Sequence, residues 1–149
     1  MFRTAFAAAA FAVVTTAVLA QTDLVAARKA VMGEQFGKHF YRALPDMLKG
    51  TTPYSQAAVD AAFAQFADGA KKLPALYTAS TKDIPPTGRY WVSQKIWSDR
   101  ADFDAKLANF VKAVGDGHAR SKSLDGLKEG FAMVDRACDS CHKSYRVRN

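Results

Sequence analysis

The chain has 149 residues, which is enough for one domain with its own core. Hydrophobic residues make up 49% and charged residues 23%, a globular composition that excludes intrinsically disordered and collagen-like proteins. The formal net charge of +7 favours acidic partners or anionic membrane surfaces through long-range attraction. Nucleic acid is not expected as a partner, because the basic residues are not interleaved with aromatic ones.

The first twenty residues have the pattern of a secretory signal peptide. Arg3 gives a basic start, residues 4–20 contain no charge, Gly or Pro, and Val18 and Ala20 suit the positions that a signal peptidase reads. An uncleaved anchor is the alternative, but residues 4–20 are at the lower edge of spanning length. We expect cleavage to leave a periplasmic domain of residues 21–149 without stable membrane insertion. Removing one arginine and no acidic residue leaves a net charge of +6.

Apolar residues recur at steps of three and four, whereas the alternation typical of strands is nearly absent. Helices are predicted over residues 23–49, 55–77, 93–114 and 124–146, joined by short turns at 50–54 and 115–122 and a longer connection at 79–92. The predicted fold is all-α, an up-down-up-down antiparallel four-helix bundle.

Several residues mark the expected helix ends and faces. Gly50 is expected to stop the first helix and Ser123 to cap the last, while Pro45 and Pro74 should disturb the final turns of their helices. The inward residues expected of the third helix are Ile96, Trp97, Phe103, Leu107, Phe110, Val111 and Val114. Those expected of the fourth helix are Leu124, Leu127, Phe131, Val134, Cys138, Cys141 and Tyr145.

Residues 138–142 read Cys-Asp-Ser-Cys-His, the C-x-x-C-H pattern of covalent haem attachment. Residues three and four apart share one face of a helix, so Cys138, Cys141 and His142 project together. Two thiols can then hold one haem c while the imidazole of His142 ligates the iron. A thioredoxin-type site would need a βαβ setting, and a structural zinc site would need about four Cys or His ligands. A disulfide across a helical C-x-x-C is geometrically awkward.

An exported four-helix chain with C-x-x-C-H close to its C-terminus resembles the class II c-type cytochromes, which include cytochromes c′ and c556. The resemblance covers the whole mature chain and is supported by residues 28–32, 53–59, 95–97 and 141–146. It implies a haem bound near the C-terminal end of the fourth helix.

Met32 is the candidate for the second axial ligand. In antiparallel first and fourth helices, Met32 and His142 lie only a few ångströms apart in level, at about 1.5 Å rise per residue. Met47 lies roughly 22 Å further along, and Met133 is on the helix of His142. The resemblance implies a ligating Met at this place in cytochromes c556 and usually a non-ligand in cytochromes c′. Ligation of the iron by Met32 and simple packing against the haem are both open.

Other residues are expected around the haem. Arg28 lies one turn before Met32, from where it could reach a haem propionate or remain on the surface. Arg146 lies one turn after His142, near the proximal haem edge, in a tail expected to be mobile. The resemblance places an Arg at both positions. Trp97, with Phe103 and Phe131, is expected to wall the haem or to be plain core.

The sequence predicts a periplasmic electron carrier with low-spin haem ligated by His142 and Met32. The alternative is a five-coordinate haem protein that binds nitric oxide or carbon monoxide in a pocket of Val31, Met32, Phe36 and Phe40. An enzyme such as a peroxidase is not expected, because His39 lies about 10 Å beyond Met32 along the helix. Expected partners are redox proteins with acidic docking surfaces. The chain could be a monomer or a homodimer.

Overall fold

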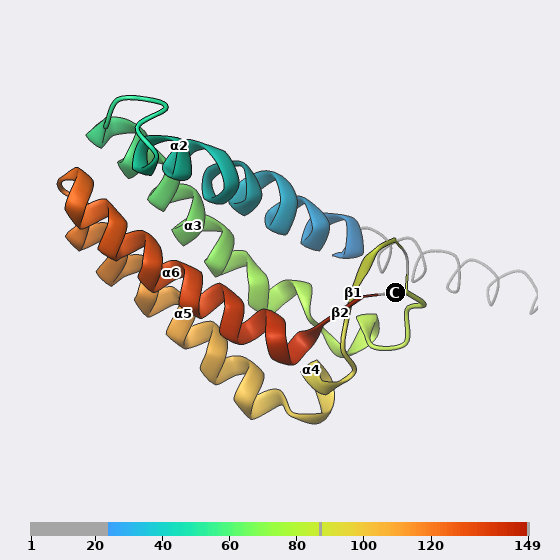
Figure 1. Ribbon diagram of the computed structural model, residues 1–149. Coiled ribbons are helices and arrows are strands. Elements are labelled where there is room, and N and C mark those ends of the chain that lie inside the picture. Colours follow the sequence, from blue (N-terminus) through green and yellow to red (C-terminus); the bar gives the residue numbers. More distant parts are fainter. Residues whose placement is uncertain (1–23, 87, 149) are drawn as a thin grey trace, which may run out of the picture.

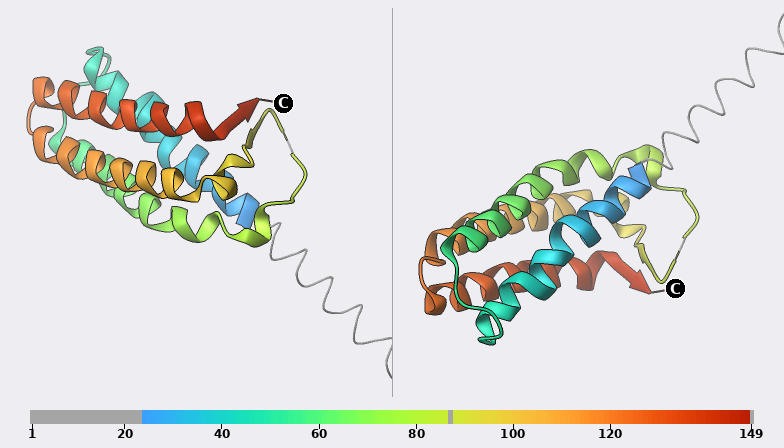
Figure 2. Two further views of the ribbon diagram at one scale, coloured as in Figure 1. Left: turned by 90° about the horizontal axis from the view of Figure 1, so that it is seen from below. Right: turned by 90° about the horizontal axis from the view of Figure 1, so that it is seen from above.

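The computed structural model describes residues 24–86 and 88–148, so the predicted signal peptide lies outside the described residues. Four long helical segments form an antiparallel bundle (Figure 1). They are residues 24–48, α3 (Gln56–Leu76), α5 (Arg100–Arg120) and α6 (Leu124–Tyr145). The first segment packs against α3 and α6, and α5 closes the ring by contacting both α3 and α6 (Figure 2). The predicted all-α four-helix bundle is confirmed.

The first segment changes helical type along its length. After a regular start it contains two π-helical stretches, η1 (Val31–Gly37) and η2 (His39–Ala43), and then a short helix, α2 (Leu44–Leu48). Pro45 lies in the first turn of α2 and has no N–H to donate to the preceding helical turn. The chain then reverses at Gly50, whose φ of +73° suits a residue without Cβ. The predicted stop at Gly50 is confirmed, whereas at Pro45 the segment changes helical type without a break, because the backbone of Ala43 stays helical (φ −54°, ψ −50°).

Capping serines begin α3 and α6. The Ser55 hydroxyl accepts a hydrogen bond from the amide of Ala58, and the Ser123 hydroxyl accepts one from the amide of Gly126. These bonds satisfy amides that would otherwise lack an intrahelical partner. The observed bounds of α3 and α6 fall within one residue of the predicted helices. Leu124 is nevertheless exposed, contrary to its predicted inward position, because it stands in the first turn of α6.

The predicted third helix is interrupted. A short helix, α4 (Lys95–Ser98), ends at Asp99, whose non-helical backbone (φ −127°, ψ 53°) separates it from α5. The predicted turn at 115–122 is also too long, because α5 continues to Arg120. Val111 is exposed, so its predicted inward position is wrong.

Two glycines explain why α5 extends through the predicted turn. A Cβ on Gly117 would lie 2.8 Å from the carbonyl oxygen of Gly130, so the two helices touch backbone to backbone. The Ser121 hydroxyl donates a 2.7 Å hydrogen bond to the Gly117 carbonyl beside this contact. Gly117 is therefore needed for a close approach of helices rather than for a turn.

Replacing Gly130 by Ala is expected to lower the free energy of unfolding by about 1–3 kcal/mol, because the added methyl group meets the backbone of α5. Gly115→Ala is the matched control: it lies in the same helix pair with open space around its Cβ position. Ala should stabilise this exposed helical position by about 0.5–1 kcal/mol. Denaturant unfolding of the two variants checks both signs, and equal effects would contradict the proposed close contact.

His118 lies in the last turn of α5 and belongs to a polar cluster at the loop end of the bundle. Its Nε2 lies 2.6 Å from Oδ1 of Asp60, and its ring stacks on Phe63 with centroids 5.2 Å apart. Gln56 donates to the same carboxylate at 2.8 Å, and Lys122 lies 3.4 Å from it. The hydrogen bond from His118, followed by that from Gln56, lowers the pKa of Asp60 to about 2.

The carboxylate of Asp60 should make stability fall in acid. Its folded-state pKa is below the ordinary 3.8, so its contribution is present above about pH 4 and is lost as the pH falls toward 2. Asp60→Asn is expected to flatten this part of the curve of unfolding free energy against pH. Asp125→Asn, an exposed carboxylate in the first turn of α6, is the control. An unchanged slope in Asp60→Asn would contradict the prediction.

A small antiparallel sheet lies at the opposite end of the bundle, where the sequence indicated no strand. β1 (Tyr90–Val92) pairs with β2 (Arg146–Arg148), with Trp91 opposite Val147 (Figure 1). The sheet ties the connection before α4 to the end of α6. In the described ranges, no helix has the length and hydropathy needed to cross a membrane.

Candidate functional site

The last two turns of α6 carry the predicted haem-binding motif. Cys138, Cys141 and His142 are all half-buried, and both cysteines are free thiols. Because they are three and four residues apart on a regular helix, they share one face, as the motif requires. The structure therefore brings the three predicted residues together.

Two adjoining cavities open beside this face, with volumes of about 190 and 160 Å³. Residues that line both cavities are Met32, Tyr77, Phe103, Cys141, His142 and Arg146. Cys138 lines the larger cavity only. Met32 comes from the first helix and His142 from α6, so two different walls supply the two candidate iron ligands.

Burial determines the protonation states of the two cysteines and of His142. It raises the pKa of Cys138 to about 12 and also raises the pKa of Cys141, so both groups are neutral thiols before any reaction. Burial, with a smaller effect from the nearby Arg146 cation, lowers the pKa of His142. A neutral imidazole is the form that ligates iron, so the environment of His142 favours the ligating state.

The surroundings of the Arg28 guanidinium indicate whether these cavities fit a haem. Its side chain is only 5% exposed, and one terminal nitrogen donates a 2.9 Å hydrogen bond to the carbonyl of Leu76. The guanidinium stands over the ring of Tyr77 at 4.4 Å, while its Nε and Nη1 are buried without a partner. A buried cation with two unused donors requires an anion. Arg28 lines the smaller cavity, where a haem propionate would supply this anion.

The end of α6 is held by contacts that sequence reasoning missed. The hydroxyl of Tyr145 donates a 2.5 Å hydrogen bond to Asp102, and the amide of Ser93 donates a 2.8 Å bond to the Tyr145 carbonyl. Burial, together with the bond to Asp102, raises the pKa of Tyr145. Because Tyr145 lies three residues after His142, these bonds fix the turn from which His142 projects.

Trp97 and Phe131, which were expected to wall the haem or to be plain core, both pack against the core. Trp97 lines neither cavity, because the break at Asp99 turns it toward Thr78, whose carbonyl accepts a 2.9 Å bond from the indole. Phe131 also lines neither cavity and stacks on Phe40 instead. Phe103 lines both cavities as predicted, and the buried Trp91 of β1 lines the smaller one.

The tail after α6 is part of the fold. Arg146 lies in β2 rather than in a free tail, and its guanidinium stands 4.9 Å from the ring centroid of Tyr90. It lines both cavities beside His142.

His39 lines neither cavity and contacts Phe66 edge to face. No sequence signal marked Trp91, because its position depends on a strand pair formed by distant segments.

Comparison with known proteins agrees with this geometry. The family model described as Cytochrome C′ matches residues 23–146. Cytochrome c-556 of Rhodopseudomonas palustris is 40% identical over 147 residues, covering 98% of this chain and 97% of that protein. The chain belongs to the cytochrome c′ family.

Other members of the cytochrome c′ family support the same assignment. Cytochrome c′ of Rhodopseudomonas palustris is 36% identical over 130 residues, covering 87% of this chain and 86% of that protein. An NMR-validated structural model of the oxidised cytochrome c556 from the same species has a TM-score of 0.74 and 38% identity, covering 86% of this chain and 98% of that one. As a family member, the protein carries covalently attached haem c.

Proposed function

We propose that the protein is a periplasmic electron carrier whose haem is attached through Cys138 and Cys141 and ligated by His142 and Met32. When bound, a His/Met-ligated haem supplies one-electron redox chemistry at a raised potential. The single observation that supports this proposal is the position of Met32, which lines both cavities together with His142 although the two residues come from different helices. The proposed periplasmic location rests on the signal-peptide pattern of residues 1–20.

The remaining residues prepare this site in distinct ways. Tyr77 and Phe103 line both cavities with buried aromatic rings, which exclude water from the space between Met32 and His142. Burial raises the pKa of Tyr77 to about 12, so its hydroxyl stays neutral beside Arg28. Arg28 provides a fixed positive charge for a propionate. A six-coordinate iron in a rigid pocket needs little atomic movement when its oxidation state changes, which suits electron transfer.

The optical spectrum tests the proposal directly. The wild-type protein, matured in a host that attaches haem c, is expected to show sharp low-spin bands in both oxidation states. Carbon monoxide should leave the spectrum of the reduced protein unchanged on mixing, because Met32 occupies the sixth position. A broad high-spin spectrum that shifts at once with carbon monoxide would contradict the proposed ligation.

A gas-binding protein with five-coordinate iron is the second candidate. The larger cavity extends past Met32 along the first helix, where Phe36 and Phe40 line it, so an apolar space adjoins the candidate ligand. Val31, also predicted to line this space, lies in the core and borders neither cavity. The same carbon monoxide experiment separates the two candidates. In both candidate functions the protein binds a gas or transfers an electron and does not catalyse a reaction on a substrate.

A further inference from the structure

Positive charge is concentrated at the end of the bundle that holds the cavities. Residues 24–33, 88–98 and 142–148 meet there and contain seven Lys or Arg residues and no Asp or Glu. The rest of the chain from residue 21 onward contains 13 basic and 14 acidic residues. These three segments therefore carry a net charge of +7, against −1 for the rest of the chain from residue 21 onward, although Asp99, Asp102 and Asp139 adjoin them.

Most of these cations are exposed at the surface. Arg28 faces the cavity, and Lys143 pairs with Asp139 at 2.5 Å. Within the described residues, no carboxylate forms an ion pair with Arg89, Lys95, Arg146 or Arg148. We call the exposed residues Lys29, Arg89, Tyr90, Lys95, Arg146, Val147 and Arg148 the basic face.

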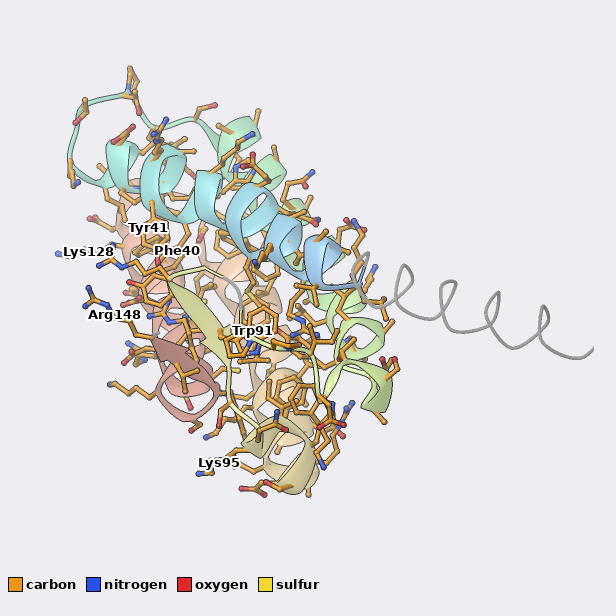
Figure 3. The ribbon with its side chains drawn as sticks, turned by 90° about the vertical axis from the view of Figure 1, so that its right-hand side faces the viewer. Phe40, Tyr41, Trp91, Lys95, Lys128 and Arg148 are labelled. Atoms are coloured by element: carbon orange, nitrogen blue, oxygen red, sulfur yellow. The ribbon has the colours of Figure 1, made fainter. Side chains whose placement is uncertain are left out.

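The basic face also contains apolar surface on a rigid support. Tyr90 and Val147 are 46% and 41% exposed, and the guanidinium groups of Arg89 and Arg146 stand 5.3 and 4.9 Å from the Tyr90 ring. Paired strands hold these side chains in fixed positions. Exposed Tyr and Arg together are typical of the central residues of protein interfaces. In Figure 3, which looks onto this end, Arg148 and Lys95 reach outward from a more central Trp91.

The basic face lies directly over the proposed redox centre. Trp91 and Val92 of β1 line the smaller cavity, and Arg146 of β2 lines both. A partner seated on the β1–β2 sheet is therefore separated from the cavity by a single layer of side chains. The opposite end of the bundle, by contrast, holds the turn between α5 and α6 (Figure 1), and His118 in the last turn of α5 contacts Asp60.

We propose that the basic face is the docking surface for an acidic redox protein, an inference that rests on the proposed electron-transfer function. Arg89 and Arg146, which form no ion pair with a carboxylate among the described residues, stand beside the exposed Tyr90 and attract carboxylates at long range, while the exposed part of the ring is available for close contact. Docking there puts the partner nearest the haem cavity. The complementary charge identifies the partner surface as one rich in Asp and Glu.

Two oxidants of opposite charge test the docking surface. Ferricyanide, a trianion, takes one electron from the reduced protein and becomes ferrocyanide, and tris(phenanthroline)cobalt(III), a trication, takes one electron to become the cobalt(II) complex. The test variant is Arg89→Gln with Arg148→Gln, which removes two charges from the basic face without touching a residue that lines a cavity. Lys49→Gln with Lys128→Gln removes two exposed charges elsewhere and is the matched control.

At low ionic strength the test variant is expected to react about three- to tenfold more slowly with ferricyanide and faster with the cobalt complex. Both differences should vanish near 0.5 M salt, where screening acts within about 4 Å. The control should stay close to wild type. Equal changes in the two variants, or no change in either, would overturn the proposal.

Vesicles of phosphatidylcholine with phosphatidylglycerol provide the second measurement. Wild-type protein should remain unbound after sedimentation at physiological salt. Binding that the test variant loses would assign the basic face to a membrane surface and overturn the proposed protein partner. The carbon monoxide spectrum reports the ligation of the iron separately, so a failure of the proposed function is distinguishable from a failure of the docking surface.

Discussion

Replacing Met32 by Ala is expected to convert a low-spin protein that ignores carbon monoxide into a high-spin protein that binds it at once. The thioether is the only proposed ligand on its side of the iron, and Ala offers no donor atom. Because His/Met ligation raises the reduction potential, we also expect a fall on the order of 0.1 V, within the roughly 0.8 V range that axial ligands set. Optical spectra with and without carbon monoxide and a redox titration measure both effects.

Met133→Ala is the matched control for this substitution. Met133 is half-buried like Met32 but lies on α6 and lines neither cavity. Its removal should reduce stability through lost packing while leaving the spectrum and the potential unchanged. If Met32 only packed against the haem, wild type would already bind carbon monoxide, and Met32→Ala would merely speed the reaction by opening space. That result would support the gas-binding candidate.

Replacing Arg28 by Leu is expected to destabilise the haem-loaded protein by about 3–5 kcal/mol and to lower its reduction potential. Burial lowers the pKa of Arg28, which shows that the site disfavours an unpaired charge, and its Nε and Nη1 have no protein partner. With a propionate beside it, the cation is paired. Without Arg28, the propionate would be the unpaired buried charge, and a less positive surrounding favours the oxidised iron.

Denaturant unfolding and redox titration of the loaded protein check the Arg28 prediction. Arg136→Leu, an exposed change on α6, should alter the unfolding free energy by no more than about 0.5 kcal/mol. A buried charge that stands alone is often replaced by an apolar residue without loss. Unchanged or higher stability in Arg28→Leu, with an unchanged potential, would therefore mean that Arg28 serves only its contacts with Leu76 and Tyr77.

The sequence predicted best those parts of the fold whose signals are local. Ser123 and the three-and-four spacing after it located α6, and with it the face shared by Cys138, Cys141 and His142. The turn predicted at residues 115–122 contains Gly117, and a glycine that permits close helix packing looks the same in sequence as a glycine that ends a helix. The two uses differ only in what lies across from the residue, and here that is Gly130.

The details of the site depended on contacts between distant segments. The expectation that Trp97 walls the haem depends on a continuous helix over residues 93–114, and the backbone at Asp99 breaks this helix. β1 consists of three residues whose partner strand lies more than fifty residues later, a distance over which no periodic pattern can indicate pairing. The π-helical turns around Met32 likewise left no sequence signal, although such turns are frequent at functional sites.

The pairing of β1 with β2 also has a consequence for the order of folding. It closes a chain loop that contains both α5 and α6, whereas the contacts between these two helices join neighbours in the sequence. Local contacts form before long loops close, so we expect the α5–α6 hairpin to assemble early and the strand pair late. Trp91 then takes its place among the last residues, and the cavity stays accessible from this side during most of the folding reaction.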